Sequence, residues 1–188
     1  MNAAAARLST LEEIEAAVAQ ELAAAVHHKS HPWRVGVLAT TDGDIGDARS
    51  VVLREWDEAH RTLLIYTDAR SAKVAQLTAH PLGTLVLWSE PLGWQLRLRV
   101  RLELQTAGLA VSSRWARLKM TPAAHDYLSP LPPGTAMDPQ HGPPPVRESR
   151  SHFAVMVARV LAVDWLELHA AGHRRAHFDS RGARWVAP

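Results

Sequence analysis

The sequence predicts a mainly β protein with flanking helices, built as an antiparallel barrel in a single domain over residues 1–188. Six or so apolar runs of strand length are separated by turns rich in Gly, Asp and charged residues. Strands that follow one another through short turns pair antiparallel, whereas parallel pairing needs long crossovers. The chain has 188 residues, 47% hydrophobic and 21% charged, which is enough for one substantial core.

A helix over residues 10–27 is the first predicted element. Thr10 and Glu13 have the spacing of a capping box. Apolar residues recur behind them at helical spacing, namely Leu11, Ile14, Val18, Leu22 and Val26. Four glutamates interrupt this alanine-rich stretch, so it suits neither a signal peptide nor a membrane span, and we expect a cytoplasmic protein without membrane contact.

Strand character begins at Trp33. The runs WRVGVLATT, ARSVVLRE and TLLIYT predict a meander, residues 71–79 predict a short helix, and GTLVLWSE and WQLRLRVRLELQT return to strands. In the last run, polar residues alternate strictly with apolar ones: Gln95, Arg97, Arg99, Arg101 and Glu103. One face of that strand therefore belongs to the core and the other is polar.

The C-terminal half is predicted to start with a helix over residues 112–119, with a second helix reaching residue 128. Residues 129–150 are too rich in proline for regular structure and are interpreted as a loop that could act as a flap. A long strand over residues 152–168 and a final hairpin over residues 177–188 complete the chain.

Composition excludes several classes of function. The chain has no cysteine, which excludes disulfides, thiolate metal sites and a cysteine nucleophile. Its net charge is only +2, which is weak evidence for a nucleic-acid partner. His27, His28 and His31 lie close in sequence, but no nearby acid completes a ligand set, so no metal site is predicted. Six tryptophans are interpreted as packing residues: Trp33, Trp56, Trp88, Trp94, Trp115 and Trp185.

Two arginines flank a predicted strand. Arg49 and Arg54 are an odd number of positions apart, so in a regular strand they point to opposite faces. One ligand could contact both only from the end or edge of the strand, or across a bulge. The alternative is that both are solvated strand-end arginines.

A second basic group lies at the start of the short helix. Tyr66 and Thr67 end a strand, and Arg70, Ser71 and Lys73 follow in or beside the first helical turn. Cations at a helix N-terminus oppose the helix dipole, and a bound phosphate reverses that effect. The sequence therefore suggests an anion-binding site at the start of this helix. The alternative is that these basic residues are exposed and bind nothing.

These motifs, taken in order, resemble those of the FMN-binding split barrels related to pyridoxamine 5'-phosphate oxidase. Those proteins have an Arg-x-Val-Leu-Leu-Lys type strand, then Tyr-Thr, Ser-Arg-Lys, a later Gln, and a C-terminal Trp followed by His and Arg. This chain has Arg49-Ser50-Val51-Val52-Leu53-Arg54, Tyr66-Thr67, Ser71-Ala72-Lys73, Gln95, Trp165, His173 and Arg175. Each motif is weak alone, and the ordered set, from Trp33 to Pro188, is specific.

The resemblance implies an antiparallel FMN-binding split β-barrel that forms a homodimer with FMN at the subunit interface. It implies that Arg49, Ser71 and Lys73 hold the phosphate, and that Arg70 could replace the contact missing at Ala72. The backbone of Val51, Val52 and Leu53, with Tyr66, Thr67 and Gln95, would meet the rest of the flavin. Trp165 and Arg175 would reach the flavin of the other subunit. Arg54 and Arg175 would stabilise the reduced flavin and position substrate, and His173 would donate a proton or contact substrate.

The chain departs from the pattern where substrate would bind. The oxidases place an arginine two residues before the histidine, and this chain has Ala171 there. The expected Tyr/Arg/Ser cluster is not evident in residues 117–130. We therefore expect an FMN-dependent oxidoreductase whose small-molecule substrate is unassigned. The alternatives are a non-catalytic flavin carrier or sensor and, from another class, a single-stranded nucleic-acid binder that uses the arginine-bearing strand.

Overall fold

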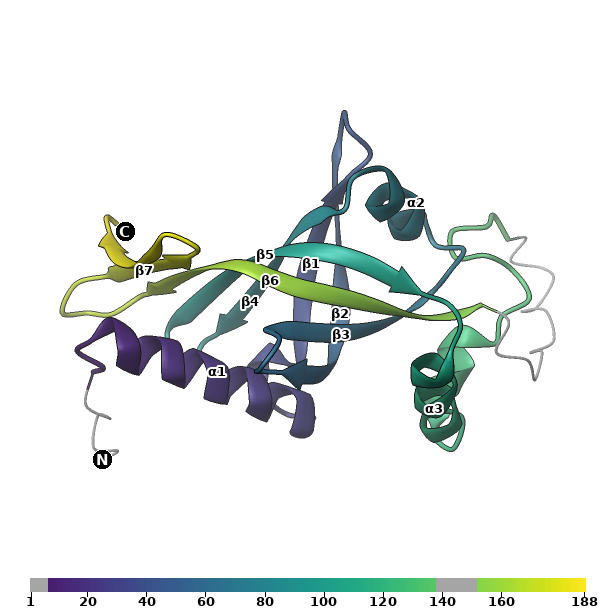
Figure 1. The fold of residues 1–188 in the computed structure, drawn as a ribbon, viewed down its shortest axis with the longest axis horizontal. Helices are drawn as coiled ribbons and strands as arrows, with labels where there is room; N and C mark the ends of the chain where they lie inside the picture. The colour runs from purple at the N-terminus through teal and green to yellow at the C-terminus, as the bar shows by residue number, and fades with distance from the viewer. Residues whose placement is uncertain (1–6, 138–151) are drawn as a thin grey trace.

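Antiparallel strands are the main regular secondary structure of the computed structural model, which describes residues 7–137 and 152–188 (Figure 1). The strands are β1 (Val35–Thr41), β2 (Gly46–Asp57), β3 (Thr62–Asp68), β4 (Leu82–Ser89), β5 (Trp94–Gln105), β6 (Phe153–Glu167), β7 (Arg174–Asp179) and β8 (Gly182–Val186). The helices are α1 (Leu11–His27), α2 (Ala72–Ala79) and α3 (Leu109–Leu118), with 3₁₀ turns at Pro32–Arg34 and Pro122–Tyr127.

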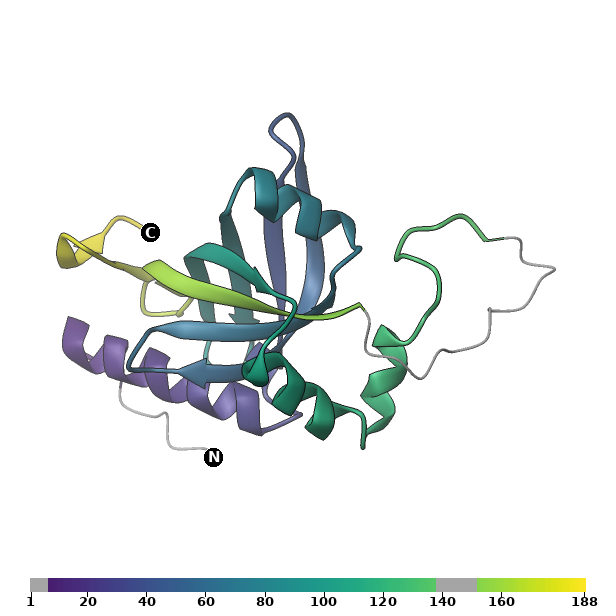
Figure 2. The same cartoon turned by 45° about the vertical axis from the view of Figure 1, so that its right-hand side comes forward.

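The strands form one sheet in the order β3-β2-β1-β4-β5-β6-β7-β8. β3 also pairs with β6, which closes the first six strands of that order into a barrel. β6 pairs with β5 along one edge, and with β3 and then β7 along the other. The β7–β8 hairpin therefore extends from the barrel, on the side away from α3 in Figures 1 and 2. The predicted antiparallel barrel is confirmed.

The barrel interior and α1 share one hydrophobic core. α1 begins with the predicted capping box of Thr10 and Glu13, and it lies along the barrel in both views. Its buried residues, such as Ile14 and Leu22, pack with barrel residues such as Leu53 and Leu98. Each fully buried Leu or Ile side chain stabilises the fold by about 1.5–3 kcal/mol. The helix thus covers one opening of the barrel.

A smaller core lies at the beginning of β6. α3 and the turn at Pro122–Tyr127 pack against the beginning of β6, with Phe153 at the centre. The Phe153 ring lies 5.1 Å from Tyr66, 5.2 Å from Trp115 and 5.4 Å from Tyr127, between ring centroids. This cluster fixes Tyr66 and Tyr127 on neighbouring elements.

Several local predictions need correction. α3 begins at Leu109, earlier than predicted, and the final hairpin begins at Arg174. Trp88 and Trp185 are 45% and 44% exposed, so they are not buried in the core of this chain, although the Trp185 ring lies 6.4 Å from that of Trp165. Residues 129–137 contain no helix or strand, as predicted for the proline-rich loop, whereas residues 138–150 of that loop lie outside the described residues. Among the described helices, none has both the length and the apolar character needed to cross a bilayer.

Arg70 connects the start of α2 to residues 129–131. Its guanidinium donates to both oxygens of Asp68 at 3.0 and 2.7 Å and to the carbonyl oxygens of Ser129, Pro130 and Leu131 at 2.8–3.2 Å. Burial, the largest effect, raises the pKa of Asp68, but the hydrogen bonds and charge of Arg70 outweigh it and leave that pKa below its usual value. Arg70 therefore holds this loop in place.

Replacing Arg70 with alanine is expected to release the loop and destabilise the fold by about 3 kcal/mol, because the buried Asp68 carboxylate loses its partner. The loss should be present near neutral pH and shrink as the pH falls through the lowered pKa of Asp68, since a protonated Asp68 no longer needs the arginine. Urea unfolding and limited proteolysis of residues 129–137 measure both effects. Arg181→Ala, in an exposed turn, is the control. An equal loss of stability and equal proteolysis in the two variants would contradict the role of Arg70 in holding the loop.

Candidate functional site

A β-bulge places Arg54 at the edge of a pocket. The pairing of β2 with β3 shifts between Leu53 and Glu55, so Arg54 is the extra residue of a bulge, which was one of the possibilities left open by the sequence. The pocket has a volume of about 240 Å³ and lies between β2, β3 and the start of α2. Six predicted site residues line it: Val51, Val52, Arg54, Tyr66, Thr67 and Lys73.

Lys73, Thr67 and Ser71 form a polar cluster at this pocket. The Lys73 ammonium donates to Thr67 Oγ1 at 3.3 Å, and Thr67 Oγ1 lies 3.4 Å from Ser71 Oγ. Both hydroxyl residues are buried. Ser71 occupies the N-cap position of α2, yet its hydroxyl makes no capping hydrogen bond. Two hydroxyls and the N-terminus of α2 therefore converge beside one ammonium.

The charge of Lys73 is poorly compensated. Within residues 7–137 and 152–188, no carboxylate lies within 4.0 Å of its ammonium. Burial lowers the pKa of Lys73 and the nearby positive charge of Arg49 lowers it further, while the charges of Asp68 and Asp47 offset only part of this shift. Because the negative charge of a bound anion would favour the charged form of Lys73, the cluster has the chemistry of an anion site.

Arg49 lies behind this cluster rather than in the pocket lining. Its guanidinium donates to Gln76 Oε1 of α2 at 2.9 Å, and it is also bonded to Thr40 and paired with Asp47. Arg49 is thereby fixed under α2, close enough to Lys73 to depress its pKa. Arg70 does not join the cluster, because Asp68 and the loop carbonyls occupy its guanidinium. The structure therefore does not support Arg70 as the replacement for Ala72.

Five other predicted residues lie outside the pocket lining: the fully buried Leu53, and Gln95, Trp165, His173 and Arg175. Gln95 of β5 and Arg175 of β7 are each paired with Leu166 of β6, so they lie in one cross-strand row. The Arg175 guanidinium donates to Asp164 at 2.9 and 2.7 Å. The exposed His173 ring accepts a hydrogen bond from the backbone N–H of His169 at 3.1 Å.

Trp165 is a core residue in this structure. Its side chain is fully buried, with its ring 5.4 Å from Trp94 and 6.4 Å from Trp185, between centroids. A ligand on the surface of this chain cannot touch it without rearrangement of the core. The structure therefore does not support a direct flavin contact for Trp165.

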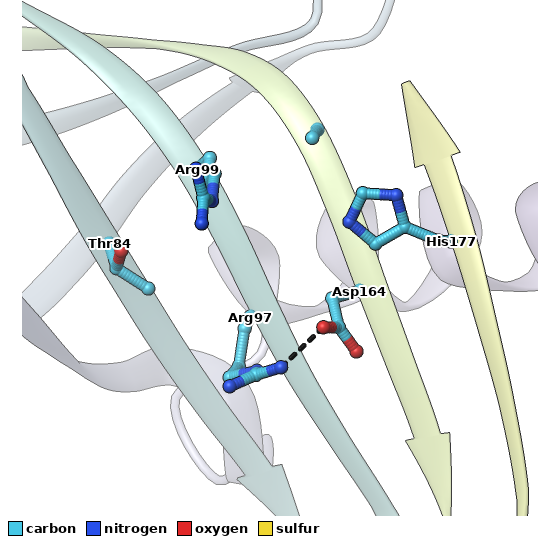
Figure 3. Close-up of a pocket in the computed structure, with 6 residues that line it drawn as sticks. Thr84, Arg97, Arg99, Asp164 and His177 are labelled. Carbon is cyan, nitrogen blue, oxygen red and sulfur yellow. Dashed lines mark hydrogen bonds and ion pairs between the residues drawn. The ribbon is translucent and has the colours of Figure 1, made fainter. Parts of the chain in front are cut away.

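The outer face beside Arg175 carries a second group of charged residues (Figure 3). Arg97 and Arg175 both bind Asp164, and Thr84, Arg99 and His177 line the same hollow across β4 to β7. The prediction that the polar residues of β5 share one face is confirmed by its alternating burial.

No group of three or more potential metal ligands occurs in the described ranges, and His31 is bonded to Glu21 at 2.8 Å.

Sequence reasoning missed the part of the pocket that comes from the C-terminal half. Asp126, Tyr127 and Pro133 line it opposite Arg54 and Lys73, and Ser50, Ile65 and Asp68 complete it. Tyr127 is buried, which raises its pKa, while the charge of Arg54 acts in the opposite direction. Asp126 and Tyr127 lie in a short 3₁₀ turn, which has no long periodic pattern that would mark them in the sequence.

Sequence comparison places these features in a known family. The model of the pyridoxamine 5'-phosphate oxidase FMN-binding domain matches residues 13–106. A pyridoxine/pyridoxamine 5'-phosphate oxidase of Caulobacter vibrioides is 32% identical over 105 residues, which is 54% of this chain and 46% of that protein. Its counterpart in Azorhizobium caulinodans is 43% identical over 70 residues, 37% of this chain and 32% of that protein. The chain thus spans less than half the length of these relatives.

Solved structures share the fold over almost the whole chain. A pyridoxamine 5'-phosphate oxidase-related FMN-binding protein of Nostoc punctiforme has a TM-score of 0.71 at 22% identity, covering 97% of this chain and 100% of that one. PhzG of Burkholderia lata has a TM-score of 0.74 at 14% identity, covering 97% and 98%. A heme-binding protein of Mycobacterium smegmatis has a TM-score of 0.53 at 19% identity, covering 94% and 60%. With the family match over residues 13–106, the chain belongs to the pyridoxamine 5'-phosphate oxidase FMN-binding domain family.

Proposed function

We propose that this protein binds FMN and acts as an FMN-dependent oxidoreductase on a small molecule. The observation that carries the proposal is the buried cluster of Lys73, Thr67 and Ser71 at the N-terminus of α2, with Arg49 behind it. Two neighbouring cations, two hydroxyls and a helix N-terminus suit a phosphate dianion. Membership of an FMN-binding family supports FMN as the molecule that carries this phosphate.

The rest of the pocket fits the remainder of the flavin. Val51 and Val52 of β2 line the pocket together with Tyr66 and Thr67 of β3, and we expect the backbone of residues 51–53 to meet the flavin there. The flavin, when bound, supplies the capacity to accept or donate a hydride. The role proposed for Arg54 is to stabilise negative charge on the ligands, because its guanidinium lies at the pocket edge, 5.3 Å above the Tyr66 ring.

We further propose that the functional unit is a cytoplasmic homodimer. The pocket of about 240 Å³ in one chain is smaller than the roughly 300–1,000 Å³ typical of small-molecule sites. A second copy would complete it, and Gln95, His173 and Arg175 are the residues we expect it to contribute, because they lie outside the lining within one chain. An isologous dimer would contain two equivalent sites.

The substrate does not follow from the relatives. The two oxidases match this chain over less than half of their length, and Ala171 stands where the resemblance calls for a phosphate-binding arginine. The alanine at position 171 in place of an arginine favours a second candidate function, that of a flavin carrier or sensor without turnover. Anaerobic mixing of the FMN-loaded protein with NADH, NADPH or pyridoxine phosphates separates the two, because bleaching of the flavin at catalytic rates contradicts a passive role.

Removing both cations of the phosphate cluster should abolish flavin retention. The variant Arg49→Ala with Lys73→Ala is expected to purify without flavin, since no basic residue then faces the phosphate. The ratio of flavin to protein absorbance measures the loss. Arg181→Ala with Lys119→Ala removes the same charge from exposed positions and should retain the flavin. Full flavin content in the Arg49/Lys73 variant would refute the phosphate assignment.

FMN affinity should fall as the pH rises through the lowered pKa of Lys73. Burial and Arg49 place this pKa below its usual value of 10.5, and a neutral amine no longer attracts phosphate. In Lys73→Arg the charge persists at every accessible pH, so its affinity should stay flat. Flavin fluorescence titrations between about pH 7 and about pH 10 measure the difference. A decline of equal size in both proteins would show that Lys73 is not the titrating group.

A further inference from the structure

Four of the seven tryptophans form a continuous row of rings that runs from the core to the surface. Trp33 lies 6.4 Å from Trp94, Trp94 lies 5.4 Å from Trp165, and Trp165 lies 6.4 Å from Trp185, between ring centroids. The first three are buried, at 0%, 7% and 0% exposure, whereas Trp185 is 44% exposed. We call these four residues the tryptophan row.

Separate elements of the fold bring the row together. Trp33 lies in the 3₁₀ turn at Pro32–Arg34, Trp94 begins β5, Trp165 lies on β6 and Trp185 lies on β8. Trp165 and Trp185 are each paired with Ala176 of β7, whose short side chain lets the two rings approach each other. In the part of the chain that the structure describes, no other tryptophan has a ring contact with a second tryptophan.

Two buried indole groups of the row have no hydrogen-bond partner. The Nε1 atoms of Trp33 and Trp165 are buried and have no acceptor anywhere in the described residues. An indole that loses one electron becomes acidic at this N–H and normally gives its proton to an acceptor. Where no acceptor is present, the proton stays in place, and the electron vacancy can pass to the next ring without a proton transfer. The buried rings therefore suit the passage of single electrons.

Arg174 fixes the outer end of the row. Its guanidinium lies 5.7 Å from the centre of the Trp165 ring and 5.7 Å from that of the Trp185 ring. A cation over an indole makes the removal of an electron harder. The buried carboxylate of Glu167, which accepts from Arg174 at 2.9 and 3.1 Å, reduces that effect. Arg174 thus holds the exposed Trp185 against Trp165.

The middle of the row lies beside residues that we assign to the flavin site of a second copy. Trp94 precedes Gln95, and Trp165 precedes Leu166, with which Gln95 and Arg175 are paired. Successive residues of a strand point to opposite faces, so the two rings lie on the core side of this part of the sheet. Electron transfer between aromatic groups does not require contact. A flavin on the outer face can therefore exchange electrons with rings that it does not touch.

We propose that the tryptophan row carries single electrons between the barrel core and the surface, with the light-excited flavin as the oxidant. This inference rests on the proposed function, because the oxidant is the FMN of that site. A buried tryptophan of the row gives one electron to the excited flavin, and the vacancy moves to Trp185. A soluble thiol or ascorbate then returns one electron to Trp185 and releases a proton to water. One electron passes from the reductant to the flavin, and no covalent bond of the protein forms or breaks.

The first test is flash photolysis of the FMN-loaded protein with blue light and ascorbate. A transient tryptophan radical is expected in optical absorption and electron paramagnetic resonance, and its decay rate should rise in proportion to the ascorbate concentration. Trp185→Phe leaves the buried rings in place and should abolish this dependence. Trp88→Phe is the matched control, because Trp88 is 45% exposed and lies outside the row. An unchanged dependence in Trp185→Phe, or its loss in Trp88→Phe, would overturn the inference.

A second test needs no flavin. Flash-generated tris(bipyridine)ruthenium(III) oxidises the flavin-free Trp88→Phe protein from solution, and peptide mapping locates the oxidised tryptophans. Because Trp185 is then the most exposed tryptophan, the vacancy should enter there and oxidise Trp165 as well. Adding Trp185→Phe should abolish the oxidation of Trp165, and equal oxidation in both proteins would contradict the proposed path.

The two tests separate the inference from the proposed function. If FMN is bound but no ascorbate-dependent tryptophan radical forms, the inference fails while the proposed function stands. If the protein binds no FMN and Trp165 is still oxidised through Trp185, the proposed function fails while the electron path along the tryptophan row stands.

Discussion

The pairing of β3 with β6 is the constraint on which the rest of the molecule depends. Seven residue pairs, from Thr62 opposite Arg159 to Asp68 opposite Phe153, close the barrel between segments about 90 residues apart in sequence. This closure sets Thr67 beside Ala154 and brings the start of α2 next to the second hydrophobic core. The pocket lies where these pieces meet, so its geometry follows from barrel closure.

The candidate site places positively charged side chains where they do not stabilise the ligand-free protein. Burial and the charge of Arg49 lower the pKa of Lys73, and Arg54 has a buried donor with no acceptor in the described chain. Elsewhere, the arginines are compensated: Arg70 by Asp68, Arg175 by Asp164, and Arg114 by Glu55. The contrast marks the pocket as a place suited to an anion. Buried, uncompensated cations lower stability, and a functional site commonly accepts such a cost.

Local patterns predicted the elements of the fold but not how they meet. The alternation along β5 and the capping box of α1 are each contained in a few adjacent residues, so the sequence displays them directly. Closure by β3 and β6, in contrast, depends on pairing across a long stretch of chain that no local period encodes. The same limit explains the exposed Trp88 and Trp185, since burial is decided by which surfaces meet.

The residues of the candidate site were likewise predicted only where they lie close together in the sequence. The residues of β2, β3 and α2 that line the pocket lie within 25 residues of one another, and the family resemblance assigned them from the ordered motifs in that stretch. Asp126 and Tyr127 reach the site only through the packing of α3 and the following turn against Phe153. The sequence position of Arg70 fits a phosphate contact, and only the structure shows its bonds to the loop carbonyls.

The central claim is that this pocket recognises a flavin by its phosphate. The most direct test compares the affinities of flavin-free protein for FMN and for riboflavin, which has the same ring and ribityl chain without the phosphate. The account predicts that FMN binds at least about a hundredfold more tightly, as expected from two or more charge-assisted contacts. It also predicts that this preference is lost in Lys73→Ala. Equal affinity for the two flavins would contradict the account.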